Sequence, residues 1–434
     1  MSSLAQTVTE ALPDPEVFQP KRNPAFILHG ALKTTFEELP VPDVGPDEVL
    51  VEVKKTSNQI TVYHNGGMGL YMVKEAMCLG HESSGIIVRL GSTLAAAAAV
   101  AKDGQSIGKT VLRIGDNVTL EPGETCRMCH DCRGGHYNVR ISDIPMIDYC
   151  TETEQLCEHM AFAATPPTHG TLQRYYKLPA DSVYLLPKSL PLVYGAMMEP
   201  LSVAVHSVAN VGGMRTGWNV LVMGAGPVGL LCMAVAKALG GHRIIAVDIN
   251  EERLNFAKSY AATDIHIPIK PEANESRPQH SARAARNLLS TLGIPERGLG
   301  SIDLVVDATG AESCIQIGIN IVKPASVFDQ PQLDLADKSP PSGTYVQTGF
   351  GPPDVQIPMF KAVTNEVNIK GAWRYSNGDY PLAIDLVARG LVDLKPLLTH
   401  TFKFEDALEA FEITKNGKDR DGKPVIKCVI NGPE

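Results

Sequence analysis

The sequence predicts an α/β protein in which a parallel α/β unit is placed inside a β-rich unit. In residues 25–53, apolar side chains alternate along short stretches, which is the pattern of antiparallel strands with one buried face. Residues 216–250 read as an apolar strand, a glycine turn, an apolar helix and a second strand. Strands and helices then alternate up to residue 369, and the remaining chain is expected to return to the first unit.

The expected elements follow the chain in order. In the first unit, alternating or apolar stretches predict strands at 25–30, 34–45, 47–55, 85–90 and 117–120. The alanine run within the stretch 94–112 favours a helix, and this stretch is expected to be an insertion. In the second unit, a helix is expected at 251–262, strands at 264–268, 301–307, 343–349 and 366–369, and surface insertions at 270–286 and 325–341. Residues 379–414 contain two helical patterns.

Composition and charge exclude several classes of function. With 434 residues, 44% hydrophobic and 20% charged, the chain is typical of a soluble globular protein of two or three domains. A net charge of −9 without a basic run argues against a nucleic-acid partner. The most apolar stretch, 220–236, is interrupted by three glycines and a proline, so no membrane association is expected. No secretory signal is visible, which predicts a cytoplasmic protein.

The glycine turn has the spacing of a dinucleotide site. Gly224 allows the tight turn, Gly226 lets the backbone approach a pyrophosphate, and Gly229 lets the helix pack closely on the strand. Free N–H groups at the start of the helix then face the phosphates. The turn in register with its strands and helix therefore predicts a nicotinamide cofactor.

Asp248 ends the second strand and decides which cofactor is expected. About 20 residues beyond the glycines, a carboxylate accepts hydrogen bonds from a ribose 2′-hydroxyl and repels a 2′-phosphate. NAD is therefore expected rather than NADP. Val228 of the turn and Arg253 of the following helix are further candidates for cofactor binding.

Beyond this turn, six passages resemble a known family. They are GHESSG at 80–85, EPG at 121–123, ATPP at 164–167, EPLSVAVH at 199–206, KGAWRY at 370–375 and KPLLTH at 395–400. From about residue 25 to its end, the chain resembles the zinc-containing polyol dehydrogenases (sorbitol, xylitol and L-arabinitol dehydrogenases) of the medium-chain dehydrogenase/reductase superfamily. EPLSVAVH and KGAWRY are similar to the polyol dehydrogenases in particular.

The resemblance implies a fold, cofactors and partners. It implies a GroES-like catalytic domain over residues 23–200 and 370–434, and a Rossmann NAD-binding domain over 201–369. It further implies NAD and zinc as cofactors, a small polyol or ketose as substrate, and a homo-oligomer, either a dimer or a tetramer.

The resemblance also implies a catalytic zinc site. His81 and Glu82 match two zinc ligands, Glu199 matches a glutamate beside the metal and its water, and Arg374 matches a residue that hydrogen-bonds substrate hydroxyls. A zinc ion with an open position polarises an alcohol and lowers its pKa, which prepares it to lose hydride to the nicotinamide.

One ligand of the resembled site is missing. Where the family has a cysteine loop, residues 55–64 contain no cysteine. Thr61 and His64 are the nearest replacements for the hydroxyl and imidazole that relay the substrate proton, and His64 is also a candidate nitrogen ligand. Cys78 lies close in sequence, but we expect a buried thiol there.

A second metal site is expected in a cysteine lobe. Cys126, Cys129 and Cys132 form CxxCxxC, and nine cysteines with three so close together suit an intracellular metal site better than disulfides. Cys157, in a context like the family's, matches the fourth zinc ligand, and removal of residues 139–155 would restore the family's spacing. Cys150 inside that segment competes for the role. The segment is either a genuine surface loop or the product of a mispredicted splice site.

Three functions follow in order of preference. The first is NAD-dependent, reversible oxidation of a polyol secondary hydroxyl to a ketone. The second is a zinc-independent reductase, which the missing cysteine supports. The third is a catalytically impaired or non-catalytic relative, against which His81, Glu82, Glu199 and Arg374 argue, because an idle site has no chemical need for them.

Overall fold

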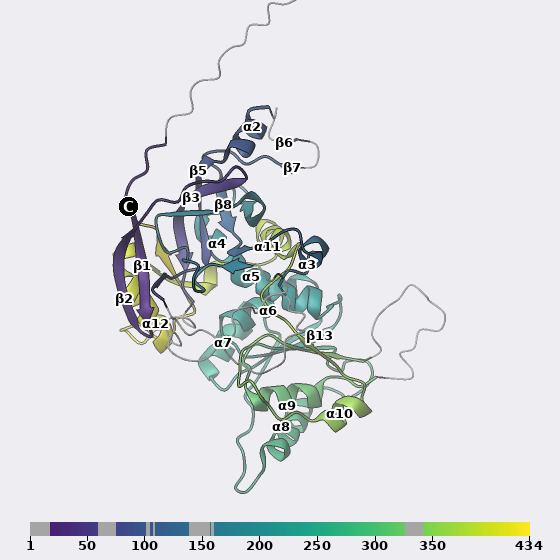
Figure 1. The fold of residues 1–434 in the computed structure, drawn as a ribbon. Helices are drawn as coiled ribbons and strands as arrows, with labels where there is room; N and C mark the ends of the chain where they lie inside the picture. Colours follow the sequence, from purple (N-terminus) through teal and green to yellow (C-terminus); the bar gives the residue numbers. More distant parts are fainter. Residues whose placement is uncertain are drawn as a thin grey trace, which may run out of the picture.

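The computed structural model describes residues 18–59, 75–100, 105–106, 109–138, 157, 160–325 and 342–434. Figure 1 shows a β-rich part that contains β1, β3 and β5, next to a sheet covered by α7, α8, α9 and α10. The mixed α/β architecture expected from the sequence is therefore confirmed.

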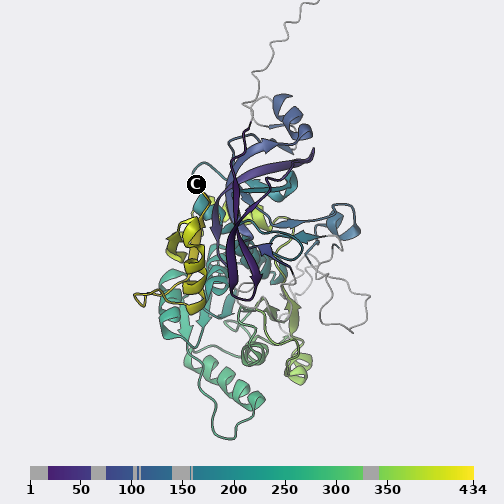
Figure 2. The same cartoon turned by 60° about the vertical axis from the view of Figure 1, so that its left-hand side comes forward.

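The β-rich part consists of strands from both ends of the chain. One sheet has the order β2 (Lys33–Leu39), β1 (Asn23–Gly30) and β4 (Met77–Cys78). The larger sheet has the order β12 (Val183–Leu185), β8 (Asn117–Leu120), β5 (Glu82–Leu90), β3 (Glu48–Ser57), β20 (Lys427–Asn431) and β19 (Leu398–Phe402), and β11 (Tyr175–Pro179) also pairs with β3. Because β20 pairs with β3, the chain returns to its first unit, as Figure 2 shows for the yellow C-terminal elements beside β1.

The second part is a six-stranded parallel sheet. Its order is β15 (Asp264–His266), β14 (Arg243–Val247), β13 (Asn219–Met223), β16 (Leu304–Asp307), β17 (Thr344–Gln347) and β18 (Asn368–Gly371). Its helices are α6 (Pro227–Ala238), α7 (Glu251–Tyr260), α8 (Arg277–Thr291), α9 (Glu312–Ile321) and α10 (Met359–Thr364). This strand order is that of a doubly wound dinucleotide-binding fold, which binds its ligand where the order reverses beside β13.

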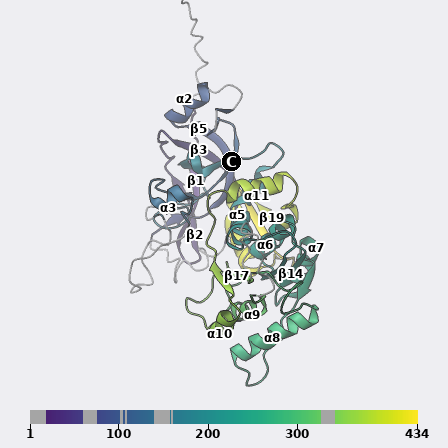
Figure 3. The same cartoon turned by 90° about the vertical axis from the view of Figure 1, so that its right-hand side faces the viewer.

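Short helices complete the β-rich part and connect it to the parallel sheet. They include α2 (Ser92–Val100), α3 (His130–Gly134), α4 (Leu192–Gly195), α5 (Met198–Val205), α11 (Asp379–Ala388) and α12 (Ala407–Asn416). Figure 3 shows α5, α6 and α11 close together, and α5 contacts both of the others. A six-residue π-helix, η4 (His206–Val211), continues α5 directly.

The structure places a helix where the sequence predicted a surface insertion. The polar stretch expected as a surface insertion at 270–286 contains the first two thirds of α8, which begins with a capping box between Ser276 and Gln279. The Ser-x-x-Gln spacing satisfies free N–H groups at the helix start and was available in the sequence. The stretch 325–341 lies almost entirely outside the described residues.

The domain boundaries remain a prediction. α5 runs across the expected boundary at 200/201, and β18 runs across the one at 369/370. Among the described residues, no helix is both long enough and apolar enough to cross a membrane.

Candidate active site

The glycine turn has the geometry that its sequence requires. Gly224 has a φ of 93°, in the left-handed region that glycine tolerates best. A Cβ on Gly229 would lie 1.8 Å from the carbonyl oxygen of Gly224, whereas a Cβ on Gly226 would meet nothing within 4 Å. The turn is therefore closed on its helix side and open at Gly226, where a phosphate can approach the backbone.

Asp248 is held at the end of β14 by the same turn. Its carboxylate accepts hydrogen bonds from the backbone N–H of Ala225 at 2.7 Å and of Asn250 at 2.9 Å. A cavity of about 180 Å³ adjoins it, lined by Gly226, Arg253 and the C-terminal residues Asn416–Lys418 among others. Gly226 and Arg253 thus line one cavity, and Asp248 is connected to it through Ala225 and Asn250, which line it too. Neither Asp248 nor Val228 lines the cavity itself.

The two predicted ligands of the catalytic zinc and the glutamate expected beside it come together between β5 and α5. His81 directly precedes β5, Glu82 is its first residue, and Glu199 lies in the first turn of α5. Their ligand atoms all lie within 4.8 Å of one another. A neutral imidazole and two carboxylates are ligands that zinc accepts, so the donor set fits the ion in part.

Burial sets the protonation of this cluster. Desolvation, reinforced by the cations of Arg374 and Lys427, lowers the pKa of His81 to about 3, so its ring nitrogen is free to bind a metal. Desolvation and then the neighbouring Glu82 carboxylate hold the pKa of Glu199 well above its usual range. A carboxyl that gains a proton so readily is suited to accept one during a reaction.

Lys427 is a member of the cluster that the sequence analysis missed. Its Nζ lies 2.8 Å from Oε1 and 2.5 Å from Oε2 of Glu82, and both side chains are almost fully buried. A lysine inside the apolar strand β20 was the available signal, since a buried cation needs a partner. Lys427 therefore competes with a metal ion for Glu82.

Arg374 lies beside the same cluster. Its guanidinium carbon is 3.4 Å from the ring centroid of Phe162, and the ring of His81 is 5.6 Å from the same centroid. Arg374 has a φ of 51°, which is unfavourable for a residue with a side chain. The structure thus brings the predicted substrate arginine and His81 to the same aromatic ring, that of Phe162.

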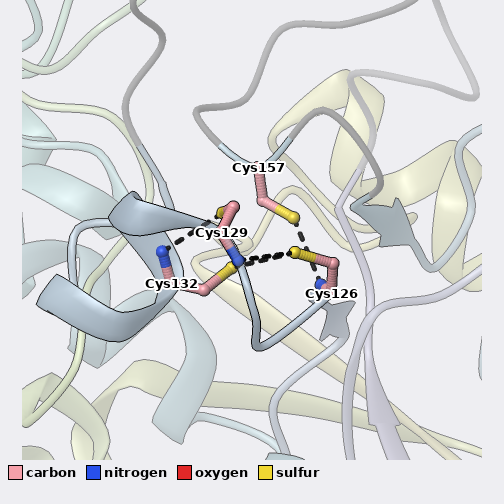
Figure 4. Close-up of side chains that lie close together, drawn as sticks. All are labelled: Cys126, Cys129, Cys132 and Cys157. Carbon is pink, nitrogen blue, oxygen red and sulfur yellow. Dashed lines mark hydrogen bonds between the residues drawn. The ribbon is translucent and has the colours of Figure 1, made fainter.

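The four predicted lobe cysteines also converge (Figure 4). The Sγ atoms of Cys126, Cys129, Cys132 and Cys157 lie within 4.8 Å of one another. Backbone N–H groups of Cys129 and Met128 lower the pKa of Cys126 to about 6, which favours the thiolate. Four thiols at this spacing fit a structural zinc ion.

Several predicted residues fall elsewhere. His64, Thr61 and the competing Cys150 lie outside the described residues. Cys78 is fully buried, and burial raises the pKa of its thiol strongly, so the expectation of a buried thiol is confirmed.

Comparisons with known proteins agree with this architecture. Residues 45–188 match the alcohol dehydrogenase GroES-like domain, and residues 227–328 match the zinc-binding dehydrogenase family. Probable D-xylulose reductase A of Emericella nidulans is 42% identical over 419 residues, which cover 95% of this chain and 97% of that protein. D-xylulose reductase A of Aspergillus oryzae is 42% identical over 418 residues, with the same two coverages.

A solved structure supports the fold alone. L-idonate 5-dehydrogenase from Escherichia coli superposes with a TM-score of 0.71 at 21% identity, covering 95% of this chain and 98% of that one. The GroES-like and Rossmann-type parts expected from the sequence are therefore confirmed. With its parallel sheet, its glycine turn and its two clusters of metal-binding side chains, this chain belongs to the zinc-binding dehydrogenases of the medium-chain dehydrogenase/reductase superfamily.

Proposed function

We propose that this protein is an NAD-dependent, zinc-containing polyol dehydrogenase that oxidises a secondary hydroxyl to a ketone and catalyses the reverse reduction. The observation that carries the proposal is the cluster of His81, Glu82 and Glu199 beside Arg374, on the β-rich part of a chain whose other part has a dinucleotide turn. The 42% identity to proteins named D-xylulose reductase supports a polyol and ketose pair as substrates.

The side chains divide the work of the reaction. Zinc held by His81 and Glu82 would polarise the substrate hydroxyl, and NAD would accept the hydride from its carbon. Glu199, which is only 6% exposed, accepts the proton of the substrate hydroxyl during oxidation and returns it during reduction. Arg374 hydrogen-bonds neighbouring hydroxyls and orients the carbon chain, which favours polyols over simple alcohols.

Arg374→Ala is expected to impair turnover without impairing cofactor binding. Loss of hydrogen bonds from a charged donor, worth about 3 kcal/mol, lowers kcat/KM for xylitol or sorbitol by about 100-fold. NADH binding, measured by fluorescence titration, should stay the same. Equal losses in both would show that Arg374 has only a structural role, and a wild-type protein inactive on both polyols would contradict the proposed function.

Asp248→Ser is expected to narrow the preference for NADH over NADPH. Serine keeps an oxygen for the backbone N–H groups but removes the charge that repels a 2′-phosphate, so the ratio of the two dissociation constants should fall about tenfold. Asp385→Ser, which removes an exposed carboxylate on α11, is the matched control. Tighter binding of NADPH than NADH by the wild type would contradict the assignment.

A second candidate function rests on the Glu82–Lys427 ion pair. Because Lys427 lies against both oxygens of Glu82, the pair balances the charge of this carboxylate without a metal, while Oε2 accepts no hydrogen bond from the described residues. An NAD-dependent reductase without catalytic zinc would use Glu199 as its proton donor. Such a protein would reduce ketoses equally well with and without a chelator in the assay.

We further propose a cytoplasmic homo-oligomer, a dimer or tetramer, that assembles through β18. In the described part of the chain, β18 ends the parallel sheet and has no strand on its outer side. Ile369 on this edge and Phe360 and Val363 on α10 are exposed apolar side chains. A free strand edge with apolar residues beside it favours pairing with a second copy.

Val363→Asp is expected to weaken this assembly. A charge placed at the interface must lose its hydration when two copies meet, so sedimentation should show more monomer than for the wild type. Val100→Asp, at an exposed valine on α2, is the control. A wild-type protein that sediments as a monomer would contradict the proposal.

A further inference from the structure

A network of buried polar groups contacts the backbone on both sides of Arg374. Asn138 donates from Nδ2 to the carbonyl oxygen of Trp373 at 2.7 Å, and its Nδ2 is 3.1 Å from Nε2 of His206. On the other side of the ring, Nδ1 of His206 lies 2.9 Å from Oδ2 of Asp379. All three residues are at most 5% exposed.

Asp379, at the other end of this network, contacts the same backbone segment. Oδ2 of Asp379 accepts a hydrogen bond from the backbone N–H of Ser376 at 2.6 Å, and its Oδ1 accepts one from Asn210. The bonds from Asn138 and Asp379 therefore meet the main chain at Trp373 and Ser376. Between these two points lies Arg374, whose φ of 51° costs free energy that surrounding contacts must supply.

The residues of this network come from separate parts of the fold. His206 begins η4, and π-helical turns are rare and occur often at functional sites. Asn138 follows Cys132 by six residues, and Gly135 between them accepts a hydrogen bond from the backbone N–H of Asn377 at 3.2 Å. Hydrogen bonds thus connect the segment that follows the lobe cysteines, η4 and residues 373–379.

We propose that Asn138, His206 and Asp379 form a buried brace that positions Arg374 for the substrate. The brace holds the backbone on both sides of Arg374, so the guanidinium stays over Phe162 and next to His81. It also connects the lobe to the substrate pocket, which gives the lobe a role in substrate binding besides local stability. The inference rests on the proposed function, because Arg374 is the residue through which the brace acts.

A fluorescence experiment tests the brace without any substrate. The chain has two tryptophans, Trp218 and Trp373, so a Trp218→Phe protein reports on Trp373 alone. Asn138→Leu, which is close in size and removes both hydrogen bonds, should shift the Trp373 emission to longer wavelength and make it easier to quench with acrylamide. Ser281→Ala, which removes the buried hydrogen bond to Gln316 in the parallel part, is the control and should leave the emission unchanged.

A kinetic double-mutant cycle tests the connection to Arg374. Misplacement of a positioning group costs up to about 100-fold, so Asn138→Leu should raise KM for the polyol and lower kcat/KM on that scale while NADH binding stays constant. In an Arg374→Ala background, the same substitution should change kcat/KM little, because its effect depends on the arginine. If Asn138→Leu does not fold, His206→Gln provides the second variant, with a smaller effect in the same direction.

The outcomes separate the brace from the proposed function. Unchanged Trp373 emission, or equal kcat/KM losses in both backgrounds, would overturn the brace. If Arg374→Ala leaves polyol turnover intact, the proposed role of Arg374 in substrate binding is wrong. The brace then has no role in positioning the substrate, even if the Trp373 emission shifts. A shift together with a loss that vanishes in the Arg374→Ala background supports both.

Discussion

Purified protein is expected to hold one zinc ion firmly, and Cys129→Ser should abolish that binding. The four thiols of the lobe converge within 4.8 Å, whereas the cluster of His81, Glu82 and Glu199 lacks a thiolate among the described residues. A complete set of four thiolates contributes on the order of 10–16 kcal/mol in small zinc domains, and oxygen ligands bind zinc less strongly. Metal analysis after gel filtration should therefore find about one zinc per chain in the wild type and almost none in the variant.

The control for this experiment is Cys314→Ser on α9, a free cysteine away from the lobe, which should leave the zinc content unchanged. Thermal unfolding of Cys129→Ser should begin at a lower temperature, because the lobe loses its cross-link. Two tightly bound zinc ions with brisk xylitol or sorbitol oxidation would show that another residue, for example His64, completes the catalytic site. Retention of the zinc by Cys129→Ser would exclude the lobe as the firm site.

Lys427→Met is expected to destabilise the metal-free protein by about 3–5 kcal/mol, the usual result of removing one partner from a buried ion pair. The substitution leaves the carboxylate of Glu82 buried at 2% exposure without its cation. The double variant Lys427→Met with Glu82→Gln should recover most of the loss, because no isolated charge then remains. Urea unfolding in the presence of a chelator measures all three proteins.

The same variant distinguishes the two candidate functions. Without Lys427, Glu82 is available to a metal, so added zinc should restore stability and raise polyol oxidation if the cluster is a zinc site. Lys323→Met, which breaks the more exposed ion pair with Asp303, is the control. It should lower the free energy of unfolding by less, and added zinc should not change its stability. A Lys427→Met protein as stable as the wild type without metal would show that the ion pair does not hold Glu82.

Local sequence patterns predicted most of the fold. The glycines of the turn, the alternating strands and the helical stretches depend on neighbours in sequence, so their conformations follow from local sterics and burial. The helix α8, which was expected as a surface insertion, had its local signal in the Ser276–Gln279 capping box. The polar composition of its first residues outweighed that signal in the sequence analysis.

Only those residues of the site that lie in recognisable sequence motifs were predicted. His81, Glu82, Glu199 and Arg374 were found because their surrounding passages resemble a family. Lys427 had no motif, and nothing in its own strand indicates that it meets Glu82, which lies 345 residues earlier in the chain.

The sequence by itself therefore determined the α/β class, the dinucleotide turn and the cysteine spacing, since each depends on residues that are close together in the chain. Only the tertiary structure decided that Lys427 pairs with Glu82 and that His81 and Arg374 both contact Phe162. It also decided the brace of Asn138, His206 and Asp379. These contacts join residues tens to hundreds of positions apart, and their partners are chosen by the burial of whole strands and helices, which no local pattern records.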